Sequence, residues 1–141
     1  MTLTNDERIL GTFFVTADRI KPSGNPAIED ILNGKRDLFM PLQSDVGAFR
    51  LISKRHIIFV ETQQTDQEIS RLTPHEPQSL VFHCTHGHTL FGVIYPTEQT
   101  HTHTRTRVSD LLSDPCQFQA VYRHGAKFIF NRGLVIYANA G

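Results

Sequence analysis

The chain repeats its own pattern. Four blocks of the first half recur in the second half in the same order, at offsets that fall from 81 to 80, 79 and 78 residues. The matched blocks are Ile9–Thr16 with Leu90–Thr97, Ile28–Asn33 with Val108–Ser113, Phe39–Leu42 with Phe118–Val121, and Gly47-Ala48 plus Ser53–Val60 with Gly125-Ala126 plus Asn131–Ala138. Single-residue insertions or deletions explain the drift because loops tolerate them. The repetition predicts a tandem duplication with units of about 60 residues at 1–62 and 80–141.

The stretch between the two units, residues 63–79, is polar and contains Pro74 and Pro77. Such composition is typical of a linker, although Ile69 and Leu72 are spaced to allow one helical turn. We therefore expect a first unit at 1–62, a linker at 63–79 and a second unit at 80–141. The total of 141 residues suits one ordinary domain or two very small ones.

Charge and hydrophobicity are balanced along the chain. Lys and Arg total 14 against 14 Asp and Glu, and hydrophobic residues make up 39% of the sequence against 20% charged residues. This composition argues against intrinsic disorder. Neutrality also removes the simple electrostatic case for non-specific binding to nucleic acid or to an anionic membrane.

Short apolar runs separated by polar breaks dominate each unit. In the first unit, the runs Phe49–Ile52 and His56–Val60 flank Ser53-Lys54-Arg55. In the second unit, Phe128–Phe130 and Leu134–Tyr137 flank Asn131-Arg132-Gly133. Two runs of β-branched and aromatic residues around a short break predict a β-hairpin in each unit, in which the two flanking runs pair with each other.

One short helical pattern occurs in each unit. Ile28, Ile31 and Leu32 have i, i+3, i+4 spacing, and the pattern returns as Val108, Leu111 and Leu112. Asp30 and Asp110 lie inside these turns, where a carboxylate suits the start of a helix better than a catalytic role. We predict an all-β fold of two tandem small SH3-like barrels, each with one short helical turn.

Two glycine-bearing stretches of the second unit resemble a known family. Val81–Val93 places Gly87 and Gly92 beside apolar Leu90 and Val93, and Phe128–Tyr137 runs from apolar residues through Arg132-Gly133 to further apolar residues. These stretches resemble the two motifs of Sm-like (LSm-type) β-barrels. The first unit is a weaker copy, with Asp6, Ile9, Gly11 and Lys54-Arg55 at the matching places.

The resemblance extends to small uncharacterised bacterial proteins of the same fold. It implies two Sm-like barrels in one chain, with association through strand edges into rings or pairs. We therefore expect a homo-oligomer or a protein partner, and pseudo-twofold packing of the two units within the chain.

Histidine is over-represented, with eight residues, and several lie close together in the second unit. Imidazole groups at short spacing are ligands for zinc or copper, so the candidate metal ligands are His83, His86, His88, His101 and His103. Cys84 lies within the same group. The alternative is structural: a polar strand face followed by a turn at Gly87.

Basic residues in the loops predict a second kind of site. The stretch Thr100–Arg107 alternates threonines with His and Arg, so one face of an extended strand would present cations to phosphates. A charged, exposed edge strand or loop is the structural alternative. The candidate residues for single-stranded RNA are Lys54, Arg55, Arg105, Arg107, Arg132 and Gly133, with Phe49 and Phe128 as stacking candidates.

No catalytic signature is present in the sequence: it has no nucleophile elbow, P-loop, dinucleotide fingerprint or His-Glu-x-x-His. We therefore expect a non-catalytic binding or scaffolding module without a cofactor, with RNA binding or metal binding as alternatives. The start of the chain has no signal-like apolar run, and no apolar stretch is long enough to cross a membrane. With Cys84 and Cys116 expected to be reduced, the prediction is a soluble cytoplasmic protein with no membrane partner.

Overall fold

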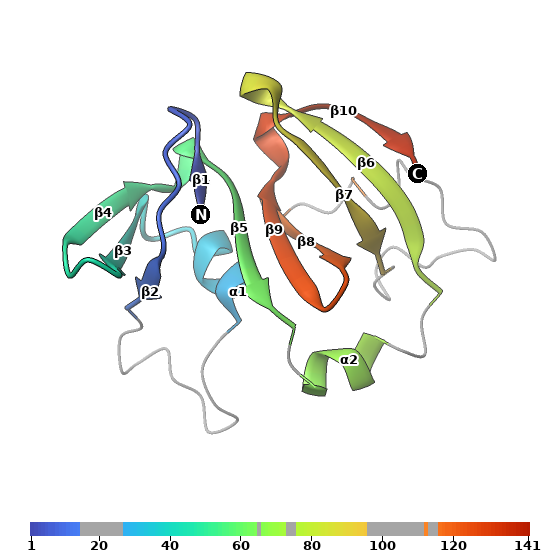
Figure 1. The fold of residues 1–141 in the computed structure, drawn as a ribbon, viewed down its shortest axis with the longest axis horizontal. Helices are drawn as coiled ribbons and strands as arrows, with labels where there is room; N and C mark the ends of the chain where they lie inside the picture. The colour runs from blue at the N-terminus through green and yellow to red at the C-terminus, as the bar shows by residue number, and fades with distance from the viewer. Residues whose placement is uncertain (15–26, 65, 73–75, 96–111, 113–115) are drawn as a thin grey trace.

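The computed structural model describes residues 1–14, 27–64, 66–72, 76–95, 112 and 116–141. Within these residues the chain forms ten β-strands and two short α-helices. The prediction of an all-β fold is thereby confirmed. Figure 1 shows two lobes side by side, with the segment between them passing below through the second helix.

The first half of the molecule contains β1 to β5 and the first helix. Their bounds are β1 Thr2–Leu3, β2 Gly11–Phe13, α1 Ile28–Asn33, β3 Phe39–Ser44, β4 Phe49–Ser53 and β5 Ile57–Gln63, with the 3-10 turn η2 Lys54–His56 between β4 and β5. The helix α1 covers the predicted helical turn. It is short, and two of its apolar residues, Ile31 and Leu32, are buried.

The second half contains β6 to β10. Their bounds are β6 Gln78–Cys84, β7 Thr89–Ile94, β8 Phe118–Arg123, β9 Ala126–Asn131 and β10 Val135–Ala140, with 3-10 turns η3 Thr85–Gly87 and η4 Arg132–Leu134. The stretch predicted as a linker holds α2, Asp66–Leu72, and its last two residues begin β6. The second predicted helical turn, 108–113, lies almost wholly outside the described residues.

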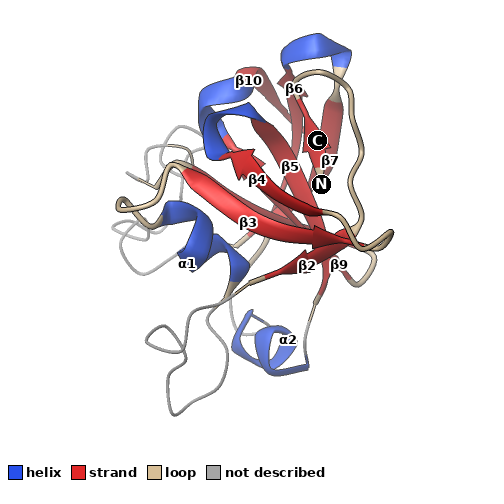
Figure 2. Cartoon of the chain, turned by 90° about the vertical axis from the view of Figure 1, so that its left-hand side faces the viewer, coloured by secondary structure: helices blue, strands red, loops and turns tan. Residues whose placement is uncertain are grey.

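The strands are arranged in two antiparallel sheets. One has seven strands in the order β1-β5-β9-β8-β7-β6-β10, and the other has three in the order β2-β3-β4. The hairpin predicted in each unit is therefore wrong. β4 and β5 lie in different sheets and β9 does not pair with β10, because the 3-10 turns η2 and η4 at the two breaks redirect the chain. Figure 2 shows the three-stranded sheet and α1 facing the viewer, in front of the larger sheet. In the part of the chain that the structure describes, neither sheet closes on itself as a barrel.

The pairing registers of the two halves correspond once the sequence offsets are applied. Leu3 pairs with Ile57 in β1–β5, and Cys84 pairs with Val135 in β6–β10, each next to a break in register. The same correspondence holds between β3–β4 and β8–β9, and between β2–β3 and β7–β8. In each half the five strands therefore follow the same order along the chain and pair in the same way where both halves pair.

A glycine at one position of each half permits close approach of two strands. A Cβ on Gly11 would collide with the backbone carbonyl of Gln43, and a Cβ on Gly92 would collide with that of Tyr122. Both glycines therefore let β2 and β7 cross tightly over the next strand of their own half. The repeated glycine has a repeated steric cause.

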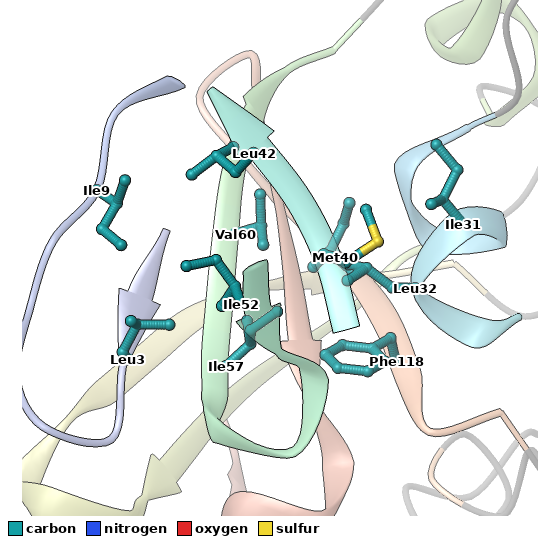
Figure 3. Close-up of a cluster of buried hydrophobic side chains, with 11 residues drawn as sticks. Leu3, Ile9, Ile31, Leu32, Met40, Leu42, Ile52, Ile57, Val60 and Phe118 are labelled. Atoms are coloured by element: carbon teal, nitrogen blue, oxygen red, sulfur yellow. The ribbon is translucent and has the colours of Figure 1, made fainter. Parts of the chain in front are cut away.

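Two buried clusters form the core, and each takes side chains from both halves. Phe118 and Ile129 of the second half lie in the cluster of the first half, and Ile58 of the first half lies in the cluster of the second. Figure 3 shows Phe118 pointing in beside Leu32. Burial of apolar surface therefore stabilises the contact between the halves as well as each half.

The two halves join where β5 pairs with β9. By the sequence offsets, β5 corresponds to β10 and β9 corresponds to β4. The contact therefore joins the fifth strand of the first half to the fourth strand of the second half. A twofold axis would instead bring together equivalent strands. The expectation of pseudo-twofold packing is therefore wrong, because the β5–β9 contact is head-to-tail.

Candidate association edges and loop pocket

Two strands of five or more residues end the sheets in the described part of the molecule. β4 ends the three-stranded sheet and β10 ends the seven-stranded sheet, so the outer side of each pairs with no described strand. The strands at the other two ends, β1 and β2, have only two and three residues. Figure 1 shows β4 and β10 on opposite sides of the molecule. An open edge presents a row of unpaired backbone N–H and C=O groups that can accept another strand.

The β10 edge carries large apolar side chains and no charge. Ile136 is 67% exposed and Tyr137 is 53% exposed. The corresponding strand of the first half, β5, is covered: Ile58 is 0% exposed there. Natural edges usually carry charges or proline that discourage pairing, and β10 has neither.

The β4 edge shows the same contrast with its counterpart. Leu51 is 61% exposed, whereas Ile129 at the corresponding position of β9 is fully buried. Phe49 is also exposed, and its ring lies 5.8 Å from that of Phe14. Arg50, the one charged residue of β4, forms an ion pair with Glu7 at 2.8 Å. The exposed residues of β4 and β10 therefore correspond to residues that are buried at the β5–β9 contact, which we call the internal contact.

The internal contact itself has a defined register. Phe59 lies opposite Phe130 and Val60 opposite Ile129, and the rings of Phe59 and Phe128 meet edge to face at 6.1 Å. Beside it, α1 is fastened to β8 because the Asn33 side chain bonds both backbone groups of Phe118, at 2.8 and 2.9 Å. The contact therefore combines a strand ladder, aromatic packing and a side-chain clamp.

A buried cation lies at the end of this contact. The Lys127 side chain on β9 is 3% exposed, and its ammonium donates to Glu29 of α1 at 3.0 Å and to Glu68 of α2. We call these three residues the Lys127 cluster. Sequence reasoning missed it, although a lysine inside the apolar run of β9 signals a buried partner. The cluster ties both halves and the intervening helix together.

A pocket of about 800 Å3 lies between the end of α1, the start of β3 and the end of β4. Lys54 and Arg55 line it, together with Lys35, Phe39 and Cys116. The Lys54 side chain is buried, and its ammonium donates to the carbonyls of Ile31 and Gly34 at 3.1 and 3.0 Å. Lys54 therefore stabilises the end of α1, whereas Arg55 and Lys35 are exposed cations at the pocket.

The remaining basic candidates occupy separate places. Arg132 and Gly133 lie in η4, at the position that Lys54 and Arg55 hold in η2. One terminal nitrogen of Arg132 is buried and has no hydrogen-bond partner among the described residues, and the Gly133 amide donates to Asn131. Arg105 and Arg107 lie outside the described residues. The described basic candidates thus form two separate pairs of sequence neighbours, Lys54-Arg55 and Arg132-Gly133.

The histidine candidates are engaged with different partners. His83 stacks on Tyr137 with ring centroids 4.2 Å apart, and His88 contacts the Asp6 carboxylate at 2.9 Å. Among the described residues no group of three His, Cys, Asp or Glu side chains is placed to hold a metal. His101 and His103 lie outside them, so the metal site stays a prediction.

The two cysteine side chains lie in different surroundings. Cys84 is buried and Cys116 is exposed. Burial raises the pKa of the Cys84 thiol, since a thiolate would lose its hydration in the core. Cys84 is therefore protonated and unreactive near neutral pH.

No family model, curated protein or solved structure matches this chain. The described part contains no helix with the length and apolar character needed to cross a membrane. The open edges, the Lys127 cluster and the pocket are therefore the features that bear on function.

Proposed function

We propose that the chain is a tandem pair of small Sm-like units, with open sheets in place of closed barrels, acting as a non-catalytic assembly module. Copies of the chain associate when β10 of one copy adds to β4 of the next. The scaffold so formed is a homo-oligomer whose subunits meet through strand edges. Corresponding pairing registers in the two halves support the duplication, because independent halves would not share them.

The observation that carries the proposal is the β5–β9 contact. It is already an association of the last strand of one unit with the fourth strand of the other. The same two kinds of strand, β10 and β4, remain open at the two ends of the molecule. Repeating the internal contact between copies therefore needs no new type of interface.

The internal register specifies the register between copies. The offset of 78 residues is added to the numbers of β5 to reach β10 and subtracted from those of β9 to reach β4. The resulting pairs are Tyr137 with Ile52, Ala138 with Leu51, Asn139 with Arg50 and Ala140 with Phe49. The exposed side chains of Ile136 and Leu51 then enter an interface. Full burial of such a side chain contributes about 1.5–3 kcal/mol.

The geometry of the contact limits the form of the assembly. A head-to-tail interface uses different surfaces on the two partners, so it generates a closed ring or an open filament. Each added chain contributes two units. A closed ring would hold an even number of units, alternating first and second.

Disulfide trapping between two variants, each with one added cysteine on an open edge strand, tests the proposal. In a Cys116→Ser background, Leu51→Cys and Ala138→Cys are prepared separately and then mixed under mild oxidation. We expect a cross-linked dimer in the mixture and little in either variant alone, because β4 meets β10 and never another β4. Asn139→Cys, whose side chain points to the other face, is the matched control for Ala138→Cys.

Cross-linking of Leu51→Cys with itself, without a mixed product, would show a twofold contact and contradict the proposal. Equal cross-linking by Ala138→Cys and Asn139→Cys would contradict the register. If no cross-linked product forms and the mixture stays wholly monomeric at high protein concentration, self-association is ruled out.

A second candidate function is binding of single-stranded RNA, and the pocket beside Arg55 favours it. The cavity combines an exposed guanidinium with the Phe39 ring, which suits a phosphate and a base. Fluorescence anisotropy with labelled RNA at two salt concentrations tests it. Salt-sensitive binding that Arg55→Ala and Arg132→Ala weaken is expected; a flat titration at low salt would remove this candidate.

A further inference from the structure

We infer that the Lys127 cluster is a specificity determinant that distinguishes the contact within a chain from the contact between chains. This inference rests on the proposed edge-to-edge assembly. If the same kind of strand contact occurs within and between copies, the four participating edges must be kept from exchanging. A charged group at one contact and an apolar group at the other achieves this.

The internal contact is charged at one defined position. Lys127 lies opposite Thr62 in the β5–β9 register, and its buried ammonium is neutralised by Glu29 and Glu68. Removing either side of such a buried pair leaves an uncompensated charge, which is strongly destabilising. The position therefore accepts a neighbour only when that neighbour supplies carboxylates.

The open edges are apolar at the corresponding position. Phe49 of β4 occupies the place of Lys127, and Ala140 of β10 occupies the place of Thr62. No charged residue occurs in β10. The contact between copies would therefore pack an aromatic ring against a small side chain, with no ion pair at that point.

Exchange of the edges would mismatch these groups. If β5 added to β4 of another copy, it would bring Glu29 of α1 toward the Phe49 ring, without the Lys127 ammonium. If β10 added to β9, Lys127 would lose the carboxylate of Glu29. Burying a charge without its partner is strongly destabilising, so β10 selects β4 and β5 selects β9.

Transplanting the charges to the open edges tests the inference on exposed positions. Phe49→Lys and Ala140→Glu are opposite one another in the register proposed for the contact between copies. Phe49→Lys alone should lower self-association at least tenfold, because it would bury an ammonium against Ala140. Ala140→Glu alone should weaken it similarly against Phe49.

Mixing the two variants should restore assembly with strict alternation of the two proteins. One contact then pairs the glutamate introduced at position 140 of one copy with the lysine introduced at position 49 of the other, and the next pairs the unchanged Ala140 with the unchanged Phe49. Native mass spectrometry with one variant isotope-labelled should show equal numbers of both. The double variant in one chain should again assemble alone, and Val46→Lys on the neighbouring turn is the surface-charge control.

Self-association of Phe49→Lys at the wild-type level, or failure of the mixture to recover, would overturn the inference while leaving assembly itself intact. A wild-type protein that stays monomeric at high concentration would instead refute the proposed function. Circular dichroism of each variant verifies that the substituted edges, which are exposed, leave the fold unchanged.

Discussion

The β5–β9 contact and the open edges of β10 and β4 use corresponding stretches of sequence in opposite surroundings. Ile58 and Ile129 are fully buried in the first, whereas their counterparts Ile136 and Leu51 are 67% and 61% exposed in the second. Packing within the chain thus explains why Ile58 and Ile129 are apolar, but it does not explain why Ile136 and Leu51 are apolar. The proposed contact between copies would give Ile136 and Leu51 the packing that they lack within one chain.

The charged end of the internal contact is where the two regions differ most. Lys127→Met would remove the buried ammonium that contacts both the Glu29 and the Glu68 carboxylates. We expect the free energy of unfolding to fall by about 3–5 kcal/mol, as when one partner of a buried ion pair is removed. Urea denaturation of the variant measures this change.

A loss below about 1 kcal/mol would show that Lys127 behaves as a surface ion pair. Substituting all three residues, as Lys127→Met with Glu29→Gln and Glu68→Gln, should recover a large part of the stability, because the charges of the Lys127 cluster are then removed together. Lys35→Met on the exposed surface is the control for loss of a lysine.

Truncation of one side chain in each region should affect folding stability very differently. Ile129→Ala should cost about 2–5 kcal/mol of folding stability, because it opens a cavity in the core. Leu51→Ala, at the corresponding exposed position, should change the stability of the dilute protein by less than about 0.5 kcal/mol. Urea denaturation of both variants at low protein concentration measures the two changes.

The two variants should rank in reverse order for association. Leu51→Ala should weaken self-association in sedimentation equilibrium while leaving unfolding of the dilute protein unchanged. If Leu51→Ala instead destabilises the dilute protein as much as Ile129→Ala, then β4 is covered within a single chain and its edge is not open.

Thiol reactivity gives the smallest expected effect. Cys116 should react with iodoacetamide in the native protein and Cys84 should not, because Cys84 is buried and its pKa is raised. A raised pKa of a thiol in the folded state contributes stability at low pH that is lost as the pH rises through the thiol range. Comparing unfolding of wild type and Cys84→Ala above and below the thiol range checks the sign.

Much of the fold follows from the sequence, because local patterns determine it. The apolar runs of β4, β5, β9 and β10 and the helical spacing of Ile28, Ile31 and Leu32 fall in the expected elements. The repeat offsets carry the pairing register as well. The local pattern could not predict that β5 pairs with β9. Both strands are apolar on both faces, so the pattern does not distinguish β9 from its counterpart β4, or β5 from its counterpart β10.

The candidate site was less predictable, for a physical reason. Lys54 is a residue type that often binds phosphate, yet its ammonium donates hydrogen bonds to the carbonyls of Ile31 and Gly34. The members of the Lys127 cluster are distant in sequence and meet only after folding. Leu51 and Ile136 look like core residues, and only their exposure in the structure distinguishes them.

Mixed cross-linking of Leu51→Cys with Ala138→Cys tests directly whether the open edges repeat the internal contact. We predict a disulfide-linked dimer that forms only in the mixture and that Asn139→Cys does not reproduce. A product formed by Leu51→Cys alone, or no product at concentrations where wild type is oligomeric, would contradict the claim that β10 of one copy pairs with β4 of the next.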